Sequence, residues 1–307
     1  MNEQKGVVFT GRCGQLLFCF GILFYRRKKL FPGNDVYLPS EQQLIYTMQE
    51  RQQNRALYFR ELSTTSERYF LPYIARFKPV VPGLRVLEIG CGDGGNLLPF
   101  ARRGCVVTGV DMAATRIDDA RRFFAEAGAE GTFIASDIFL LKDLEASFDI
   151  IVCHDVLEHI GDKATFLTNL RRYVKPGGVV FMSFPAWQMP FGGHQQTLQS
   201  RWTSRLPFIH LLPNFLYSAI MRAGGADRRC IDGMLDIKRT RCTIELFERL
   251  ARRTGMHIAD RRLYFINPHY EVKFHLRPRR LSPLIGAIPY VRDFFTTSCF
   301  YIMKSEG

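Results

Sequence analysis

The feature that most constrains this chain is a glycine-rich turn between an apolar run and a helical pattern. Residues 85–89 (RVLEI) have the composition of a buried strand, and residues 96–103 have that of a helix. Glycine at such a strand-to-helix turn lets the backbone approach a ligand closely, because no side chain intervenes. We therefore expect a ligand site at this turn, which contains Gly90, Cys91, Gly92 and Gly94.

An acidic residue closes the next apolar run. Residues 105–110 (CVVTGV) predict a second strand, and Asp111 follows it directly, 19 residues after Gly92. An acid at this place in a strand–helix–strand unit is positioned to bind the hydroxyls of a ribose. The turn and the acid together predict a cofactor that contains adenosine.

The charge of Glu88 distinguishes two such cofactors. Gly90, Gly92 and Gly95 match the pattern G-x-G-x-x-G of dinucleotide-binding proteins, which on its own is weakly diagnostic. A dinucleotide places its pyrophosphate at the helix N-terminus, and Glu88 would add negative charge beside it. S-adenosylmethionine (SAM) has no phosphate and carries a sulfonium and an ammonium. The sequence therefore favours SAM over NAD.

Further motifs continue this pattern in chain order. Met112 follows Asp111, and the segment 136–138 (SDI) follows an expected third strand. Residues 148–159 (FDIIVCHDVLEH) and 170–178 (LRRYVKPGG) come next. Together with the glycine-rich turn, these segments resemble the class I SAM-dependent methyltransferases, and the Leu-Glu-His element is similar to that of quinone-biosynthesis O-methyltransferases.

The resemblance implies an enzyme that transfers a methyl group from SAM to an oxygen or nitrogen atom of a small or lipid-like molecule. It implies that Asp111 binds the ribose, that Asp137 meets the adenine amino group and that Met112 packs on the adenine. The cofactor-binding residues that it implies are Glu88, Gly90, Cys91, Gly92, Gly94, Asp111, Met112, Asp137, Ile138 and His154.

Apolar strands alternate with amphipathic helices from residue 85 to residue 184, which predicts a parallel sheet covered on both faces. Ligands bind beyond the carboxyl ends of such strands, where Glu88, Asp111, Asp137 and His154 fall. The expected strands are 85–90, 105–110, 131–135, 148–153 and 178–184, and the expected helices are 94–103, 113–127, 139–146 and 163–174.

The C-terminal part adds a helix over 243–254 and strands over 257–265 and 298–304. In the fold that the resemblance implies, the last strand inserts antiparallel into the sheet. The expected fold class is thus α/β, a Rossmann-like, doubly wound sheet of seven strands with N-terminal helices. Residues 188–242 interrupt the alternation with aromatic residues, proline and arginine. We interpret them as a substrate lid, with a decorative insertion as the alternative.

The N-terminal residues 1–39 form an apolar and basic extension to a domain that covers 40–307. Ser40 and Gln43 fit a capping box, and a short helix is expected over 65–77. The apolar run 16–25 precedes four basic residues, and it is shorter than the roughly 20 residues that span a bilayer. Three interpretations remain open: a peripheral membrane contact through 16–29, packing on the domain, and a dispensable extension.

Candidate catalytic groups follow from the chemistry. Methyl transfer from a sulfonium needs in-line positioning in a dry pocket, and a hydroxyl acceptor must also lose its proton. We expect His194, His159 and Asp155 to be catalytic, after also considering His154 and His210. We expect no metal. Residues 266–270 (INPHY) resemble an element of DNA amino-methyltransferases, but we set them aside because they follow the sixth strand and not the fourth.

Composition leaves the partner open. The net charge of +13 fits either a solvated basic surface or an anionic partner, and it does not choose among an acidic substrate, an acidic membrane surface and nucleic acid, of which nucleic acid is the least expected. The 8 cysteines form no C-x-x-C pair and predict a reducing compartment, so we expect a cytoplasmic protein, with membrane association as an alternative. An RNA methyltransferase and a non-catalytic SAM-binding domain remain alternative functions.

Overall fold

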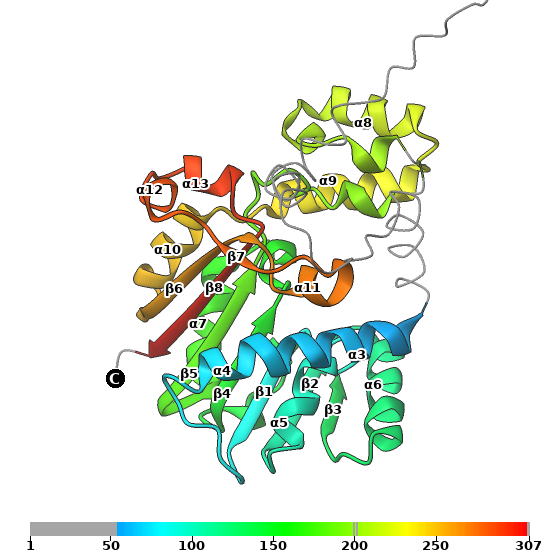
Figure 1. The fold of residues 1–307 in the computed structure, drawn as a ribbon. Coiled ribbons are helices and arrows are strands. Elements are labelled where there is room, and N and C mark those ends of the chain that lie inside the picture. Colours follow the sequence, from blue (N-terminus) through cyan, green and yellow to red (C-terminus); the bar gives the residue numbers. More distant parts are fainter. Residues whose placement is uncertain (1–53, 199, 201, 306–307) are drawn as a thin grey trace, which may run out of the picture.

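The apolar runs of the sequence form the strands of one mixed sheet (Figure 1). The structure is a computed structural model that describes residues 54–198, 200 and 202–305. The extension 1–39, the capping box at Ser40 and the segment 16–29 lie outside the described residues. The described strands are β1 (Arg85–Ile89), β2 (Val106–Asp111), β3 (Thr132–Ala135), β4 (Phe148–His154), β5 (Val174–Phe184), β6 (Met256–Ile266), β7 (Arg279–Arg280) and β8 (Ser298–Ser305). Their order across the sheet is β3-β2-β1-β4-β5-β8-β6-β7.

Helices cover both faces of the sheet, because successive side chains of a strand point to opposite sides. In β4, Ile150 and Val152 pack with the helices between residues 55 and 126, whereas Ile151 and Cys153 pack with the helices over 163–173 and 244–253. The two-sided burial confirms the predicted α/β fold. The helices are α3 (Arg55–Thr65), α4 (Leu71–Ile74), α5 (Leu98–Ala101), α6 (Ala114–Glu126), α7 (Lys163–Tyr173), α8 (Asn214–Ala223), α9 (Arg228–Thr240), α10 (Ile244–Arg253), α11 (His269–Phe274), α12 (Pro283–Gly286) and α13 (Val291–Phe294).

The last strand is antiparallel to both of its neighbours, as expected. Tyr301 of β8 pairs with Met182 of β5 on one side and with Arg261 of β6 on the other. The described sheet has eight strands and not the expected seven, because β7 pairs with β6 through Tyr264 and Arg280. This strand has only two residues, both arginine, so no apolar alternation could predict it.

Three expected helices differ from those observed. The helix expected over 94–103 is a 3₁₀ turn (Gly95–Leu97) followed by α5, which has Pro99 in its first turn, where proline is tolerated. The helix expected over 139–146 is a pair of 3₁₀ turns. The helix expected over 65–77 continues α3 through a π-helical turn (Ser66–Phe70) into α4.

The segment 188–242 carries its own structure. Helices α8 and α9 enclose a small apolar core with Leu198, Ile209 and Tyr217, and they lie beyond the carboxyl ends of the strands (Figure 1). The hydroxyl of Thr240, at the end of α9, donates a 2.6 Å hydrogen bond to the Glu158 carbonyl after β4. This contact holds the insertion over the edge of the sheet where a ligand is expected. No helix in the described ranges is long and apolar enough to cross a bilayer.

Two carboxyl groups, one fully buried and one partly buried, meet where α10 and α13 pack together. Asp293 is fully buried and accepts a 2.9 Å hydrogen bond from the Ile244 amide, and Glu245 accepts one of 3.0 Å from Arg292. Their other oxygens receive no further hydrogen bond from the described residues, so a proton between the two carboxyl groups satisfies both. Burial and the hydrogen bond with Glu245 raise the pKa of Asp293 to about 7.

This pair predicts how Asp293→Asn changes stability with pH. Asp293 keeps its proton in the folded state between its ordinary pKa of 3.8 and about 7, whereas the unfolded state loses it, so wild-type stability falls over that window. Asparagine donates to Glu245 at every pH. We expect the variant to gain about 1–2 kcal/mol relative to wild type between pH 4 and pH 7, measured by thermal unfolding at unit pH intervals. A constant difference would contradict the shared proton.

Candidate active site

The glycine-rich turn after β1 has the geometry of a ligand cradle. Gly90 and Gly92 have φ values of +69° and +52°, which favour glycine. A Cβ atom on Gly90 would lie 2.3 Å from Cγ2 of Val156, whereas a Cβ on Gly92 would meet only Cζ of Arg116, at 3.9 Å. Gly90 is therefore required for packing, and Gly92 presents bare backbone to open space.

Asp111 is held at the end of β2 by two backbone amides. Its Oδ2 accepts a 2.9 Å hydrogen bond from Gly92, and its Oδ1 accepts one of 2.9 Å from Ala113. Each carboxylate oxygen can accept a second hydrogen bond. The carboxylate is thus oriented with the capacity to bind two neighbouring hydroxyl groups, as the sequence predicted for a ribose.

These residues line a cavity of about 430 Å³ at the carboxyl ends of β1, β2 and β4. Its walls include the apolar side chains of Ile138, Phe139 and Ile160, and Asp137 is oriented by a 3.0 Å hydrogen bond from the Phe139 amide. The expected cofactor residues that line it are Gly90, Cys91, Gly92, Asp111, Met112, Asp137, Ile138 and His154. Apolar walls with carboxylates at two strand ends fit an adenosine group.

Two expected cofactor residues lie outside the lining of this cavity. Gly94, with φ +82°, faces the core, where an added Cβ would lie 3.0 Å from the ring of Phe133. Glu88 is buried under the turn, and its Oε1 accepts a 2.7 Å hydrogen bond from Asn96. Burial raises the pKa of Glu88 to about 8, despite that hydrogen bond. The side chain of Glu88 points inward, and with a pKa of about 8 it is mostly neutral at pH 7, so the structure does not support the expected negative charge beside the ligand.

A cluster of ion pairs, which the sequence did not reveal, stabilises the glycine-rich turn after β1. Asp93 is fully buried and pairs with Arg116 of α6 at 2.8 Å and with Arg55 of α3 at 3.4 Å. Burial raises the pKa of Asp93 to about 6, with the charge of Arg55 opposing the rise. The only sequence signal was an acid inside the glycine-rich turn, and its partners lie 38 and 23 residues away.

A second cavity of about 540 Å³ adjoins the first, and we call it the acceptor chamber. Tyr58, Arg116, Asp155 and His159 line both cavities. The chamber also draws side chains from the insertion and from α11. Its other described lining residues are Arg55, Glu158, Pro185, Met189, His194, Gln196, Thr197, Asn267, His269, Tyr270, Lys273 and Thr297.

All three residues that the sequence suggested as catalytic line this chamber. The imidazole rings of His159 and His194 meet edge to face, with centroids 5.3 Å apart. Burial lowers the pKa of both, and that of His194 falls to about 4. Burial also acts to raise the pKa of Asp155, but the charge of His154, whose Nδ1 lies 3.2 Å away, outweighs it, so the pKa lies below its usual value.

The other two histidines considered from the sequence have different surroundings. His154 lines the cofactor cavity, and its Nδ1 lies 3.0 Å from the hydroxyl of Ser183. His210 is fully buried inside the insertion, where Nε2 donates a 2.8 Å hydrogen bond to the Trp187 carbonyl. His210 therefore stabilises the insertion and does not line either cavity.

The segment that we set aside from the sequence, 266–270, contributes to the chamber. Asn267, His269 and Tyr270 line it, because the turn after β6 brings α11 against α3. Nδ1 of His269 lies 2.7 Å from the hydroxyl of Thr65, whose single proton goes to the Glu61 carbonyl at 2.8 Å. When the hydroxyl donates to that carbonyl, Nδ1 of His269 donates to Thr65 and the lone pair of the ring lies on Nε2.

Comparisons with known proteins show which families the chain is similar to. Residues 86–178 match the family model described as "Methyltransferase domain". A ubiquinone biosynthesis O-methyltransferase of Chelativorans sp. (strain BNC1) is 40% identical over 101 residues, which are 33% of this chain and 40% of that protein. That of Pasteurella multocida (strain Pm70) is 29% identical over 144 residues, which are 42% of this chain and 60% of that protein. The matches thus span about half the length of these relatives.

The fold also has a solved counterpart. A Galdieria sulphuraria structure, assigned provisionally as a sarcosine dimethylglycine methyltransferase, superposes with a TM-score of 0.52 at 18% identity, over 78% of this chain and 85% of that one. With the cavity and its carboxylates, these findings define a Rossmann-like methyltransferase domain. The chain contains a class I SAM-dependent methyltransferase domain, and SAM is the cofactor of that domain.

The cofactor cavity predicts the effect of Asp111→Asn. The amide replaces one oriented acceptor oxygen by a donor and removes the negative charge. We expect SAM to bind at least about tenfold more weakly, which corresponds to about 1.4 kcal/mol. Isothermal titration calorimetry with SAM and S-adenosylhomocysteine measures this, with NAD as a ligand expected not to bind. Asp118→Asn, an exposed change on α6, is the matched control. Equal SAM affinity in all three proteins would contradict the assignment.

Proposed function

We propose that this protein is an O-methyltransferase that acts on a hydroxyl group of a small or lipid-like molecule. One observation carries the proposal: the acceptor chamber adjoins the cofactor cavity and shares Tyr58, Arg116, Asp155 and His159 with it. A molecule in the chamber would therefore face the cofactor directly. The two sequence relatives named above are ubiquinone biosynthesis O-methyltransferases, which supports oxygen as the methylated atom.

The residues of the chain supply positioning and proton acceptance. SAM supplies an electrophilic methyl group whose transfer leaves a neutral thioether. The acceptor oxygen forms the new bond to that methyl carbon as the carbon–sulfur bond breaks, and the hydroxyl proton must leave to a base. We propose His194, His159 and Asp155 as groups that contact the acceptor. Neutral imidazoles can accept the proton, for which His159, His194 and His269 are candidates.

A transfer assay tests the function. Protein is incubated with methyl-labelled SAM and with phenols, hydroquinones or lipid extracts, and labelled product is identified by mass spectrometry. We expect label on a hydroxyl oxygen of a compound small enough for the chamber. Label on RNA, or no transfer to any acceptor by a protein that binds SAM, would favour the RNA methyltransferase or the non-catalytic alternative.

His194 separates acceptor chemistry from cofactor binding, because it lines only the acceptor chamber. We expect His194→Gln to lower kcat/KM for the acceptor at least about tenfold, or about 1.4 kcal/mol, while SAM affinity stays within twofold. His257→Gln, which changes an exposed histidine of β6, is the control. Unchanged transfer in His194→Gln would contradict a role of His194 in acceptor binding or proton transfer.

A lipid-like acceptor would be met at a membrane, and the segment 16–29 suggests how. Its apolar run and basic cluster suit peripheral contact with anionic headgroups. We expect deletion of residues 1–39 to abolish co-sedimentation with phosphatidylglycerol vesicles while SAM binding is retained. Vesicles of phosphatidylcholine alone are the control for charge. Equal sedimentation of both proteins would assign any membrane contact elsewhere.

A further inference from the structure

A buried carboxylate in the wall of the acceptor chamber lacks the partners that such a group needs. Glu158 is 4% exposed, and neither of its carboxylate oxygens has a hydrogen-bond partner among the described residues. Lys163 lies close enough to act on its charge, but its ammonium group donates to the Thr240 carbonyl. Burying a carboxylate without a partner is costly, so burial raises the pKa of Glu158 well above its ordinary value unless a cation or a hydrogen-bond donor satisfies the group.

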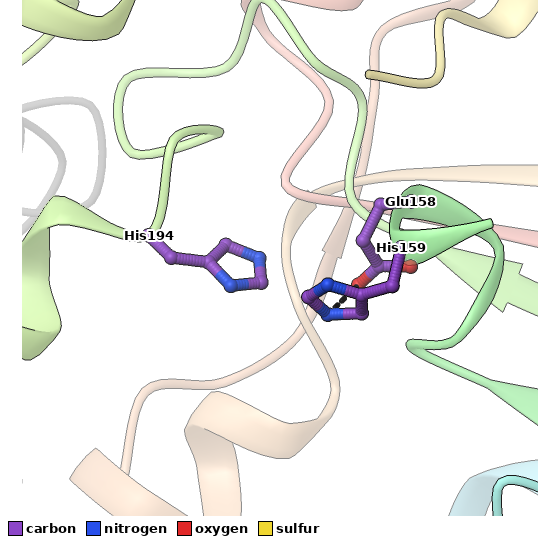
Figure 2. Close-up of side chains that lie close together, drawn as sticks. All are labelled: Glu158, His159 and His194. Carbon is purple, nitrogen blue, oxygen red and sulfur yellow. Dashed lines mark ion pairs between the residues drawn. The ribbon is translucent and has the colours of Figure 1, made fainter. Parts of the chain in front are cut away.

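Two imidazoles converge on this carboxylate. Glu158 and His159 come from one 3₁₀ turn after β4, and His194 reaches toward them from the insertion (Figure 2). Nε2 of His159 lies 4.0 Å from Oε1 of Glu158, and one donor atom of each of the three residues lies within 4.8 Å of the others. Nitrogen and oxygen donors therefore gather around one point at the edge of the chamber.

We propose that Glu158, His159 and His194 bind one divalent transition-metal ion. Two imidazoles and one carboxylate form a donor set that suits Zn²⁺ and similar ions such as Co²⁺, and it is poorly suited to Mg²⁺ or Ca²⁺, which prefer oxygen. Three protein ligands leave a further coordination position open. Because all three residues line the chamber, an oxygen atom of the acceptor can occupy that position.

The site needs only a small closure to reach metal-binding geometry. Donor atoms around a tetrahedral Zn²⁺ lie about 3.3–3.6 Å apart. In this structure the three donor atoms of Glu158, His159 and His194 lie within 4.8 Å of one another. The backbone of Glu158 is fixed by the hydrogen bond from Thr240. His194 lies in a loop of the insertion, and rotation of its side chain would bring its ring nitrogen closer to Glu158 and His159.

This inference rests on the proposed function and assigns roles within it. Ligation occupies one ring nitrogen of His159 and of His194, so these residues would orient the metal and not accept the proton. The metal lowers the pKa of a hydroxyl that it binds. His269 also lines the chamber, and with His159 and His194 bound to the metal it would be the imidazole left to accept the proton of that hydroxyl. The methyl carbon bonds to the resulting oxygen anion, and the thioether leaves.

The test is a titration of tag-free, EDTA-treated full-length protein with Co²⁺, followed by its visible absorption. We expect one equivalent to produce the bands of a four- or five-coordinate site, and Zn²⁺ to displace it stoichiometrically. Glu158→Gln, His159→Gln and His194→Gln should each raise the Kd for Co²⁺ at least tenfold, and His257→Gln should leave it unchanged. SAM binding checks that each variant is folded, and His194→Gln changes only a loop side chain.

The outcomes separate this inference from the proposed function. Absence of stoichiometric Co²⁺ binding, or binding that is equal in all variants and therefore an adventitious ion only, overturns the metal site. Methyl transfer that survives EDTA treatment undiminished overturns the catalytic role of the metal and leaves the proposed function intact. Stoichiometric Co²⁺ binding that the three variants lose supports the site even where no acceptor is methylated.

Discussion

The buried carboxylate of Asp93 is the interaction on which the rest of the site depends. It lies inside the glycine-rich turn and pairs with Arg55 of α3 and Arg116 of α6. The carboxylate of Asp93 is fully buried, whereas the side chains of Arg55 and Arg116 are about one-third exposed, so the two arginines offset the cost of burying the carboxylate and remain partly hydrated. Asp93 therefore joins two helices to the backbone that cradles the cofactor. Both arginines also line the acceptor chamber, so one ion-pair cluster positions the walls of both cavities.

The two cavities form one continuous site because the loop after β4 contributes to both. Asp155 has a left-handed backbone (φ +53°), an uncommon conformation that marks a structurally constrained position. This conformation places Asp155 in the walls of both the cofactor cavity and the acceptor chamber. Glu158 and His159 follow on the next turn. The insertion closes the far wall with His194, and α9 holds the turn through Thr240. The titratable side chains of the acceptor chamber thus come from separate segments of the chain, which the sheet topology brings together.

Much of the cofactor site could be predicted because its residues follow consecutive strands. Gly92, Asp111 and Asp137 each lie at a strand end, and parallel strands bring those ends to one edge. Glu88 shows the limit of this reasoning, because strand position does not say that its side chain is buried under Asn96. His269 shows a second limit. Its motif seemed misplaced in sequence, yet the turn after β6 carries α11 to the chamber.

By itself, the sequence determined the α/β class and the edge of the sheet where the glycine-rich turn meets the acids at the strand ends, and it suggested the histidines that we propose as catalytic. These follow from local signals: apolar periodicity, glycine at a turn, and acids at strand ends. Only the tertiary structure decided which of those histidines meet. His159 and His194 converge on Glu158, whereas His210 is buried in the insertion. The physical reason is that such contacts depend on how helices and an inserted segment pack on the sheet, which no periodicity in the chain encodes.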